Sequence, residues 1–217
     1  MAGVGTDHDP DDWRAAGGNI QSVTFYLALC NALLKTEPFL NWSTWYPQDD
    51  GSVVVQELGI HDFGCAHGDG TAVLQATFPM AHVTGIDLSE AAVAEALNRW
   101  PTLDFRIGDI QAPETTADVI IACHVVEHLT DPVGTILNLR KYCSLLVVVL
   151  PTITAEHDGG HTGAVLTTDI IAGLERQLDR YATVGYLTLR SDAEHPGCGI
   201  VETNNVFVIG GELTCDS

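Results

Sequence analysis

The stretch that decides the fold reads ELGIHDFGCAHGDGT and covers residues 57–71. Its first half is a short apolar run of the kind that forms a buried strand, and the pattern from residue 69 onward indicates a helix. The small residues between the two let a ligand approach the backbone closely. The glycines are not spaced as GxGxxG, so the pyrophosphate fingerprint of nicotinamide-dependent enzymes is a poor match.

The alternation of apolar runs and helical periods continues along the chain. The runs predict strands at residues 57–63, 82–87, 103–107, 118–123, 144–150, 182–190 and 201–209. The helical periods predict helices at residues 69–78, 89–99, 132–141 and 167–179. Such alternation is typical of an α/β fold with a parallel sheet and right-handed crossovers. No helical pattern separates the last two strands, so we expect them to form an antiparallel hairpin.

The chain before residue 57 divides into a polar leader and a helix. Residues 1–18 are acidic and polar, which favours a flexible leader. In residues 19–36, apolar side chains recur at helical spacing and predict an amphipathic helix with Asn19 as its cap; they include Ile20, Val23, Leu27, Cys30 and Leu34. The candidates for a lid are Trp13, Arg14, Tyr26, Trp42, Trp45 and Tyr46, with core packing the alternative for Tyr26 and for some of the tryptophans. We therefore expect a leader and lid helix over residues 1–50 and the main domain over residues 51–217.

The charge balance of the chain is strongly acidic. Its 29 acidic residues against 9 basic ones give a formal net charge of -20. A field of this sign repels phosphate backbones, so nucleic acid is a disfavoured partner. An acidic surface poor in lysine also resembles proteins adapted to high salt, which makes a halophilic source a hypothesis.

The chain shows no sign of a membrane span, a secretory leader or a disulfide framework. Its longest apolar run, Leu145 to Leu150, has the length of a strand. The acidic start does not resemble a signal peptide, so a cytoplasmic location is expected. The six cysteines contain no CxxC pair and are expected to be reduced.

Two further acids follow the next two predicted strands. Asp87 ends the run VTGID, where a carboxylate can accept hydrogen bonds from both hydroxyls of a ribose. Asp109 follows the third strand, where it can accept from an adenine amino group. Since the carboxyl ends of neighbouring parallel strands meet at one edge of a sheet, these acids and the glycine-containing loop predict one crevice shaped for a nucleoside.

This ordered set, followed by ADVIIACHVVEH at residues 117–128, resembles the class I S-adenosylmethionine-dependent methyltransferases over about residues 57–152. The resemblance implies a Rossmann-like, seven-stranded, mostly parallel sheet of order 3-2-1-4-5-7-6, with strand seven antiparallel and helices on both faces. It also implies methyl transfer from S-adenosylmethionine to oxygen or nitrogen of a small molecule, by a monomer or homodimer, leaving S-adenosylhomocysteine. Two alternatives remain: a catalytically silent cofactor-binding module that acts through a partner, and a nucleotide-dependent oxidoreductase.

The resemblance assigns roles by position in the motifs. The loop from Gly64 to Gly68 would lie beside the methionine part of the cofactor, with Asp62 fixing the loop. Asp87 would bind the ribose and Asp109 the adenine amino group. The full set expected at the cofactor is Asp62, Gly64, Cys65, Ala66, Gly68, Asp87, Leu88, Asp109, Ile110, Cys123 and His124, with Leu88 and Ile110 on the two faces of the adenine. Ala66 departs from the family pattern, because many members have glycine there.

His128 and His124 are the candidate catalytic residues. Oxygen and nitrogen nucleophiles often need a proton removed, and a histidine of near-neutral pKa can accept it. The two imidazoles would share one helical face if the turn after the fourth strand is helical. Alternatively, Glu127 and His128 only stabilise the loop. Some similar enzymes bind a divalent ion through an acid-x-x-Glu-His array, so His124, Glu127, His128 and His161 are also candidate metal ligands.

Overall fold

A single seven-stranded sheet organises the computed structural model, which describes residues 18–34, 46–47, 53–54, 58–151, 167–178, 182–190 and 201–210. Its strands are β3 (Gly59–Phe63), β4 (His82–Asp87), β5 (Asp104–Ile107), β6 (Ala117–Cys123), β7 (Cys143–Pro151), β8 (Ala182–Arg190) and β9 (Val201–Gly210). They lie in the order β5-β4-β3-β6-β7-β9-β8. β9 is antiparallel to both of its neighbours, so the predicted order and the predicted hairpin are confirmed.

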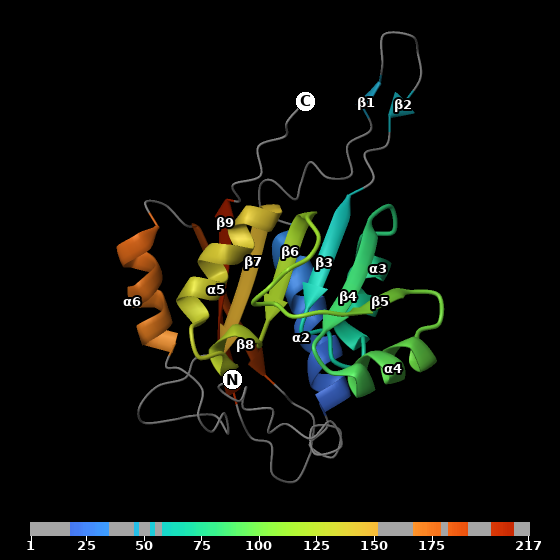
Figure 1. Ribbon diagram of the computed structural model, residues 1–217, viewed down its shortest axis with the longest axis horizontal. Coiled ribbons are helices and arrows are strands. Elements are labelled where there is room, and N and C mark those ends of the chain that lie inside the picture. Colours follow the sequence, from blue (N-terminus) through green and yellow to red (C-terminus); the bar gives the residue numbers. More distant parts are fainter. Residues whose placement is uncertain are drawn as a thin grey trace.

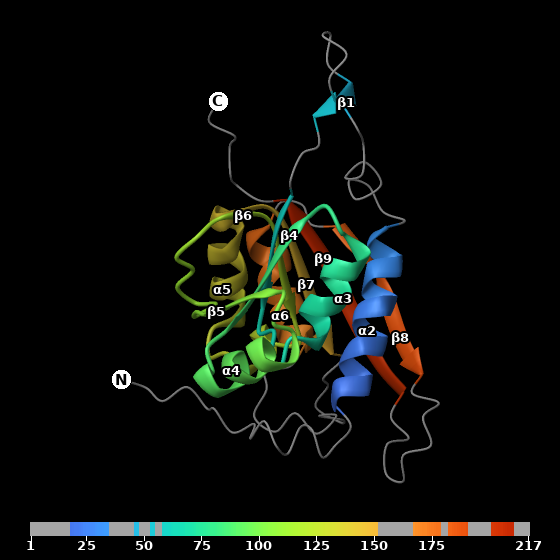
Figure 2. The same ribbon diagram turned by 90° about the vertical axis from the view of Figure 1, so that its right-hand side faces the viewer.

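Helices cover both faces of this sheet (Figures 1 and 2). They are α2 (Gly18–Leu33), α3 (Asp69–Thr77), α4 (Glu90–Arg99), α5 (Pro132–Leu139) and α6 (Thr167–Gln177), with 3₁₀ turns η2 (Val126–His128) and η3 (Arg140–Tyr142). α2 and α3 lie on one side and α5 and α6 on the other. α4 packs against β5, where Val93 and Ala96 bury Phe105. None of the described helices combines the length and the hydropathy that crossing a membrane requires.

The strands that lie inside the sheet are buried on both faces, which explains their unbroken apolar runs. Alternate residues of β7 enter different cores: Val147 packs in the core under α2, whereas Leu146 packs in the core under α5 and α6. Both side chains are fully buried. The continuous run at residues 145–150 is therefore a central strand with helices on both sides.

The helix predicted near the N-terminus is confirmed as α2 and Cys30 is buried as predicted, but the cap and the predicted burial of Leu27 and Leu34 are wrong. Leu27 and Leu34 are 55% and 44% exposed, whereas Phe25, Tyr26 and Leu29 are buried. Ten of the sixteen residues of this helix are apolar and none is charged, so hydrophobic spacing alone could not choose the face. The helix also begins at Gly18, which places Asn19 inside its first turn rather than at the cap.

A small antiparallel pair, β1 (Tyr46–Pro47) with β2 (Val53–Val54), precedes the main sheet. The sequence pattern left open whether residues 53–56 extend the first strand or close the preceding helix, and Val53–Val54 does neither. Its two strands lie on either side of residues 50 and 51, between which we expected the lid segment to end and the main domain to begin.

Candidate functional site

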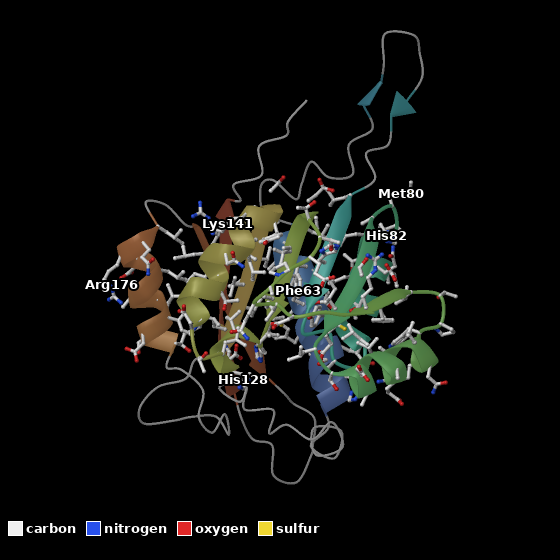
Figure 3. All side chains as sticks on the ribbon, in the orientation of Figure 1. Phe63, Met80, His82, His128, Lys141 and Arg176 are labelled. Atoms are coloured by element: carbon white, nitrogen blue, oxygen red, sulfur yellow. The ribbon has the colours of Figure 1, made fainter. Side chains whose placement is uncertain are left out.

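The carboxyl ends of β3, β4, β5 and β6 lie side by side. Phe63, the last residue of β3, is paired with Ile86 on β4 and with Ala122 on β6. Asp87 at the end of β4 is in turn paired with Ile107 at the end of β5. Figure 3 shows His128 beyond this edge of the sheet, with Met80 and His82 near the opposite edge. The loops that follow these strands therefore meet in one region.

Three residues of the loop after β3 have left-handed backbone conformations. Gly64 and Gly68 have φ angles of 75° and 81°, and Ala66 has a φ of 46°. A Cβ added to Gly64 would lie 2.1 Å from Cγ2 of Val125, and one added to Gly68 would lie 2.5 Å from Cζ of Phe105. Both glycines are thus required for conformation and for space. Ala66 adopts a conformation that costs an L-residue about 1–2 kcal/mol.

Asp62 ties the two ends of this loop together. Its carboxylate is fully buried, and its Oδ2 accepts a hydrogen bond from the hydroxyl of Thr71 in α3 at 2.7 Å. Its Oδ1 accepts from the Tyr26 hydroxyl of α2 at 2.8 Å. Burial raises the pKa of Asp62 to about 6, although both hydrogen bonds act in the opposite direction. The end of β3, the start of α3 and helix α2 therefore share one buried carboxylate.

Asp87 fixes the middle of the same loop. Its Oδ2 accepts from the backbone N–H of Ala66, and its Oδ1 from that of Ser89, both at 2.9 Å. Ser89 in turn caps α4 by accepting from the N–H of Ala92 at 3.2 Å. Because each carboxylate oxygen has a second lone pair, these contacts leave Asp87 able to accept further hydrogen bonds.

Asp109 lies in the turn that follows β5. Its Oδ1 accepts from the N–H of Gln111 at 2.8 Å, which closes an Asx turn. The two apolar residues expected at the adenine differ in exposure: Ile110 is 7% exposed and packs with Phe63, whereas Leu88 is 48% exposed. Leu88 thus presents an apolar side chain beside the acid of β4.

The cysteines of the site are buried thiols. Cys65 and Cys123 are 6% and 8% exposed. Burial raises the pKa of the Cys65 thiol far above its ordinary value, so this residue is not a nucleophile at neutral pH. Cys30 and Cys143 are also buried, and in the described part of the chain none of these four cysteines is paired with another. Cys198 and Cys215 lie outside the described residues.

The structure separates the two candidate bases. His124 has a φ of 55° at the end of β6, and its backbone N–H donates to the carbonyl of Val149 at 3.0 Å. Only residues 126–128 form the following 3₁₀ turn. The two imidazoles therefore do not share one helical face, and that expectation is wrong. His124 has a left-handed backbone conformation, and the helical turn begins only at Val126. The His124 ring instead lies 4.9 Å, between centroids, from the Phe25 ring of α2.

His128 lies in η2 beside a buried acid. Its Nε2 is 3.8 Å from Oε1 of Glu127, which has an exposed fraction of 0%. Within the described part of the chain, no three His, Cys, Asp or Glu side chains come together in a way that could hold a metal ion. His161, the fourth metal candidate, lies outside the described residues, as do Trp13, Arg14 and the loop at 154–161.

Sequence reasoning missed two contacts that build the site. Tyr26 lies 36 residues before Asp62, and no spacing rule connects them. Arg99, at the end of α4, donates two hydrogen bonds of 2.9 and 2.8 Å to the carboxylate of Asp69 in the first turn of α3. An acid in the first turn of α3 and a base in the last turn of α4 were visible in the sequence, but each also has a local electrostatic explanation.

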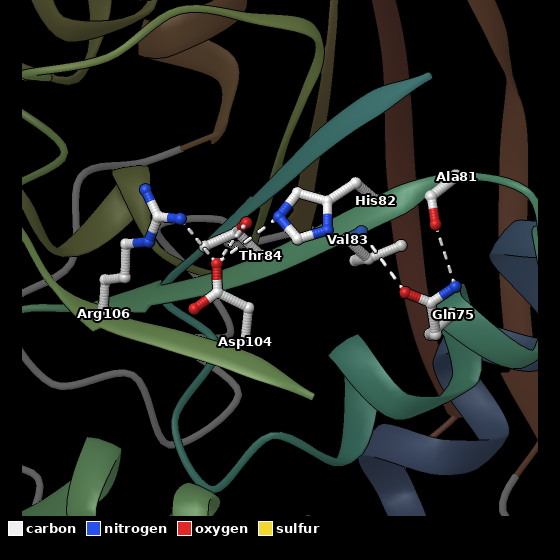
Figure 4. A network of polar contacts seen from close by, with 7 residues as sticks. All are labelled: Gln75, Ala81, His82, Val83, Thr84, Asp104 and Arg106. Atoms are coloured by element: carbon white, nitrogen blue, oxygen red, sulfur yellow. Dashed lines mark hydrogen bonds and ion pairs between the residues drawn. The ribbon is translucent and has the colours of Figure 1, made fainter. Parts of the chain in front are cut away.

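A second polar network lies around the amino ends of β4 and β5 (Figure 4). Asp104 accepts from the Thr84 hydroxyl at 3.1 Å and forms ion pairs with Arg106 and His82, with N···O distances of 2.7 and 3.5 Å. Nearby, the Gln75 amide donates to the carbonyl of Ala81 at 2.9 Å. These contacts join β4 to β5 and α3 to β4, and none of them involves a residue expected at the cofactor.

Comparisons with known proteins agree with this arrangement. Residues 61–144 match the family model described as methyltransferase domain. Trans-aconitate 2-methyltransferase from Escherichia coli O17:K52:H18 is 42% identical over 74 residues, and the Shigella flexneri serotype 5b enzyme is 39% identical over 74 residues. Each match covers 33% of this chain and only 29% of the relative's length.

Solved structures share the fold along nearly the whole chain. One is a chain of the complex between the Haloferax volcanii Trm112 methyltransferase activator and the putative methyltransferase, with a TM-score of 0.62, 13% identity, and coverage of 94% of this chain and 97% of that one. Another is magnesium protoporphyrin IX methyltransferase from Synechocystis PCC 6803 with bound SAM, with a TM-score of 0.55, 16% identity, and coverage of 95% and 86%. The shared Rossmann-like fold and the matched motif region are thus similar to those of the class I S-adenosylmethionine-dependent methyltransferases.

Proposed function

We propose that this protein transfers a methyl group from S-adenosylmethionine to oxygen or nitrogen of a small molecule. One observation carries the proposal: a glycine-containing loop, Asp87 and Asp109 follow three strands that are adjacent in the sheet. In open α/β sheets, ligands bind outside the carboxyl ends of the strands. Names of relatives support a small-molecule acceptor, since two of them refer to trans-aconitate and to magnesium protoporphyrin IX.

The residues at these strand ends fit S-adenosylmethionine. Asp87 and Asp109 supply acceptors for hydroxyl and amino hydrogens, and the half-exposed Leu88 offers an apolar surface beside them. The positive φ angles at Gly64 and Gly68 keep the loop free of side chains where a ligand would approach. When bound, the cofactor supplies a methyl group that its sulfonium already activates for displacement. The protein's own task is to bind, orient and exclude water.

Proton removal from the acceptor is the step that we assign to His128 or His124. The buried carboxylate of Glu127 lies 3.8 Å from the His128 Nε2, so the two side chains are neighbours at this strand end. His124 is held from two sides, by the carbonyl of Val149 and by the Phe25 ring. The net charge of -20 favours a small acceptor over nucleic acid.

Calorimetric titration with S-adenosylmethionine and S-adenosylhomocysteine tests the proposal. We expect micromolar binding that is lost in Asp87→Ala. The matched control is Asp118→Ala, because Asp118 also accepts from a backbone N–H, that of Gly59 at 2.7 Å, but at the opposite end of β6. Binding that survives in Asp87→Ala, or a preference for NAD, would contradict the proposal.

A labelled methyl donor incubated with fractionated small-molecule extracts then tests turnover. We expect transfer to a small molecule by the wild-type protein, with a loss of at least tenfold in His128→Ala or His124→Ala if that histidine is the base. Binding without transfer to any fraction would instead favour a silent cofactor-binding module.

A further inference from the structure

Helix α2 contacts two of the strand ends that form the site. Its Tyr26 side chain donates to Asp62 at the end of β3, and the neighbouring Phe25 ring packs against His124 at the end of β6. Both aromatic residues are buried, at 6% and 3% exposure. In Figure 2, α2 lies beside α3 and β8 on one face of the sheet. Two consecutive residues of α2 thus contact Asp62, which is expected at the cofactor, and His124, which is a candidate base.

The Tyr26 ring fills a space that exists only because the first turn of α3 contains a glycine, Gly70. A Cβ added to Gly70 would lie 2.4 Å from two ring atoms of Tyr26. The ring therefore rests directly on the first turn of α3, and its hydroxyl reaches past it to Asp62. This placement fixes the position of the hydroxyl more firmly than an exposed tyrosine would allow.

The two hydroxyls on Asp62 come from different parts of the fold. Thr71 belongs to the helix that the cofactor loop itself leads into, so its hydrogen bond is local to the motif. Tyr26 comes from outside the motif and donates to the other carboxylate oxygen. A buried carboxylate that loses a donor is strongly disfavoured in its charged form. Tyr26 is therefore the contact through which α2 can influence the charge and orientation of Asp62.

None of the described titratable groups that interact with Asp62 is a cation that would stabilise its negative charge. Asp87 raises its pKa through charge repulsion, and Tyr26 and Thr71 lower it through hydrogen bonds. The other titratable groups that interact with Asp62 or with its partner Tyr26 are thiols: Cys30 of α2, Cys65 of the loop and Cys123 of β6. No described cation takes part in these interactions, so hydroxyl donors carry the stabilisation of the carboxylate.

We propose that Tyr26 is a positioning residue for the cofactor, because its hydroxyl orients the Asp62 carboxylate and keeps it charged, and so couples the docking of α2 to the shape of the loop at residues 64–68. This inference rests on the proposed function. Once Asp62 is protonated, one carboxyl oxygen becomes a donor and one of the two hydroxyls must turn to accept. The hydrogen bonds by which Asp62 joins β3 to α3 and α2 are then weaker. A cationic ligand also loses a nearby negative charge.

The pH dependence of cofactor affinity follows from this arrangement. Since burial raises the pKa of Asp62 to about 6 in the folded chain, affinity falls as the pH falls through that value. Without the Tyr26 hydroxyl, the pKa rises further, so the loss of affinity begins at a higher pH. A tyrosine that only filled space would change affinity without moving this midpoint.

The experiment compares wild-type protein, Tyr26→Phe and the control Tyr142→Phe by calorimetric titration with S-adenosylhomocysteine from pH 5 to pH 8. Tyr142 packs against the opposite core and is absent from the Asp62 network. We expect the midpoint for Tyr26→Phe to move up by about one pH unit, while the control follows the wild type. In parallel, the carbon-13 shift of the Asp62 carboxyl reports its pKa without any ligand, and should show the same displacement.

An unchanged Asp62 pKa in Tyr26→Phe would overturn the inference, as would an affinity loss that is equal at every pH. If Tyr26→Phe does not fold, Tyr26→Met, which keeps an apolar side chain over Gly70 but no hydroxyl, takes its place, and an unchanged Asp62 pKa there would overturn the inference in the same way. A wild-type protein that binds neither S-adenosylmethionine nor S-adenosylhomocysteine would contradict the proposed function. The pKa of Asp62 measured without ligand tests the Tyr26 contact independently of that result.

Discussion

Replacing Gly64 with alanine tests whether the ends of β3 and β6 meet as described. Its φ of 75° costs an L-residue about 1–2 kcal/mol. The new Cβ would also lie 2.1 Å from Cγ2 of Val125, and overpacking of this kind costs about 1–3 kcal/mol. We therefore expect Gly64→Ala to lower the free energy of unfolding by about 2–5 kcal/mol, a large part of the stability of a typical domain.

A double-mutant cycle separates the two contributions. Val125→Ala removes Cγ2 and leaves the Val125 Cβ as the nearest atom at 3.2 Å, so the clash disappears while the backbone cost remains. The cycle should show a favourable coupling of about 1–3 kcal/mol in urea unfolding. Gly210→Ala is the control, because an added Cβ there meets nothing within 4 Å. A Gly64→Ala variant as stable as this control, or a coupling near zero, would refute the reasoning.

Three further predictions concern the surroundings of the site. In a double-mutant cycle of Asp69→Ala and Arg99→Ala, we expect a coupling of about 1–3 kcal/mol in chemical unfolding, because the pair is bidentate and Asp69 is buried; additive effects would show that the pair contributes nothing. His61 is 7% exposed, and its Nδ1 has no hydrogen-bond partner among the described residues. Burial lowers the pKa of His61 in the folded state, so the unfolded chain binds a proton more readily and the folded state loses stability as the pH falls below about 6.5. His61→Leu should then equal or exceed the wild type in stability and lose less of it between pH 7 and pH 5, which urea titrations of both proteins across this pH range would check. Because the net charge is -20, the melting temperature should rise by several degrees from low to molar KCl, and equal values in both would contradict the interpretation of the acidic surface.

The sequence predicted the sheet better than the helix that packs beside the site. Strands such as β4 and β7 follow from β-branched runs with clear ends, because a central strand is buried on both faces whatever its partners. α2 has ten apolar residues and no charged one, so only tertiary packing decides that Leu27 is exposed and Tyr26 is buried.

The acids of the site were found because each follows a strand, and neighbouring parallel strands end together. Their partners were not found in the same way. The contact of Asp87 with the Ala66 N–H depends on the left-handed turn at Ala66, and that of Asp62 with Tyr26 depends on how α2 docks. The misplaced expectation for His124 has the same origin, since a positive φ in a histidine leaves no mark in the hydrophobic pattern.

A crystal structure with S-adenosylhomocysteine is the most direct test of the central claim. We expect the ribose hydroxyls at the Asp87 carboxylate, the adenine beside Leu88 with its amino group near Asp109, and the amino acid part along the loop from Gly64 to Gly68. A ligand bound elsewhere in the chain, or a protein side chain occupying the region between these strand ends, would contradict it.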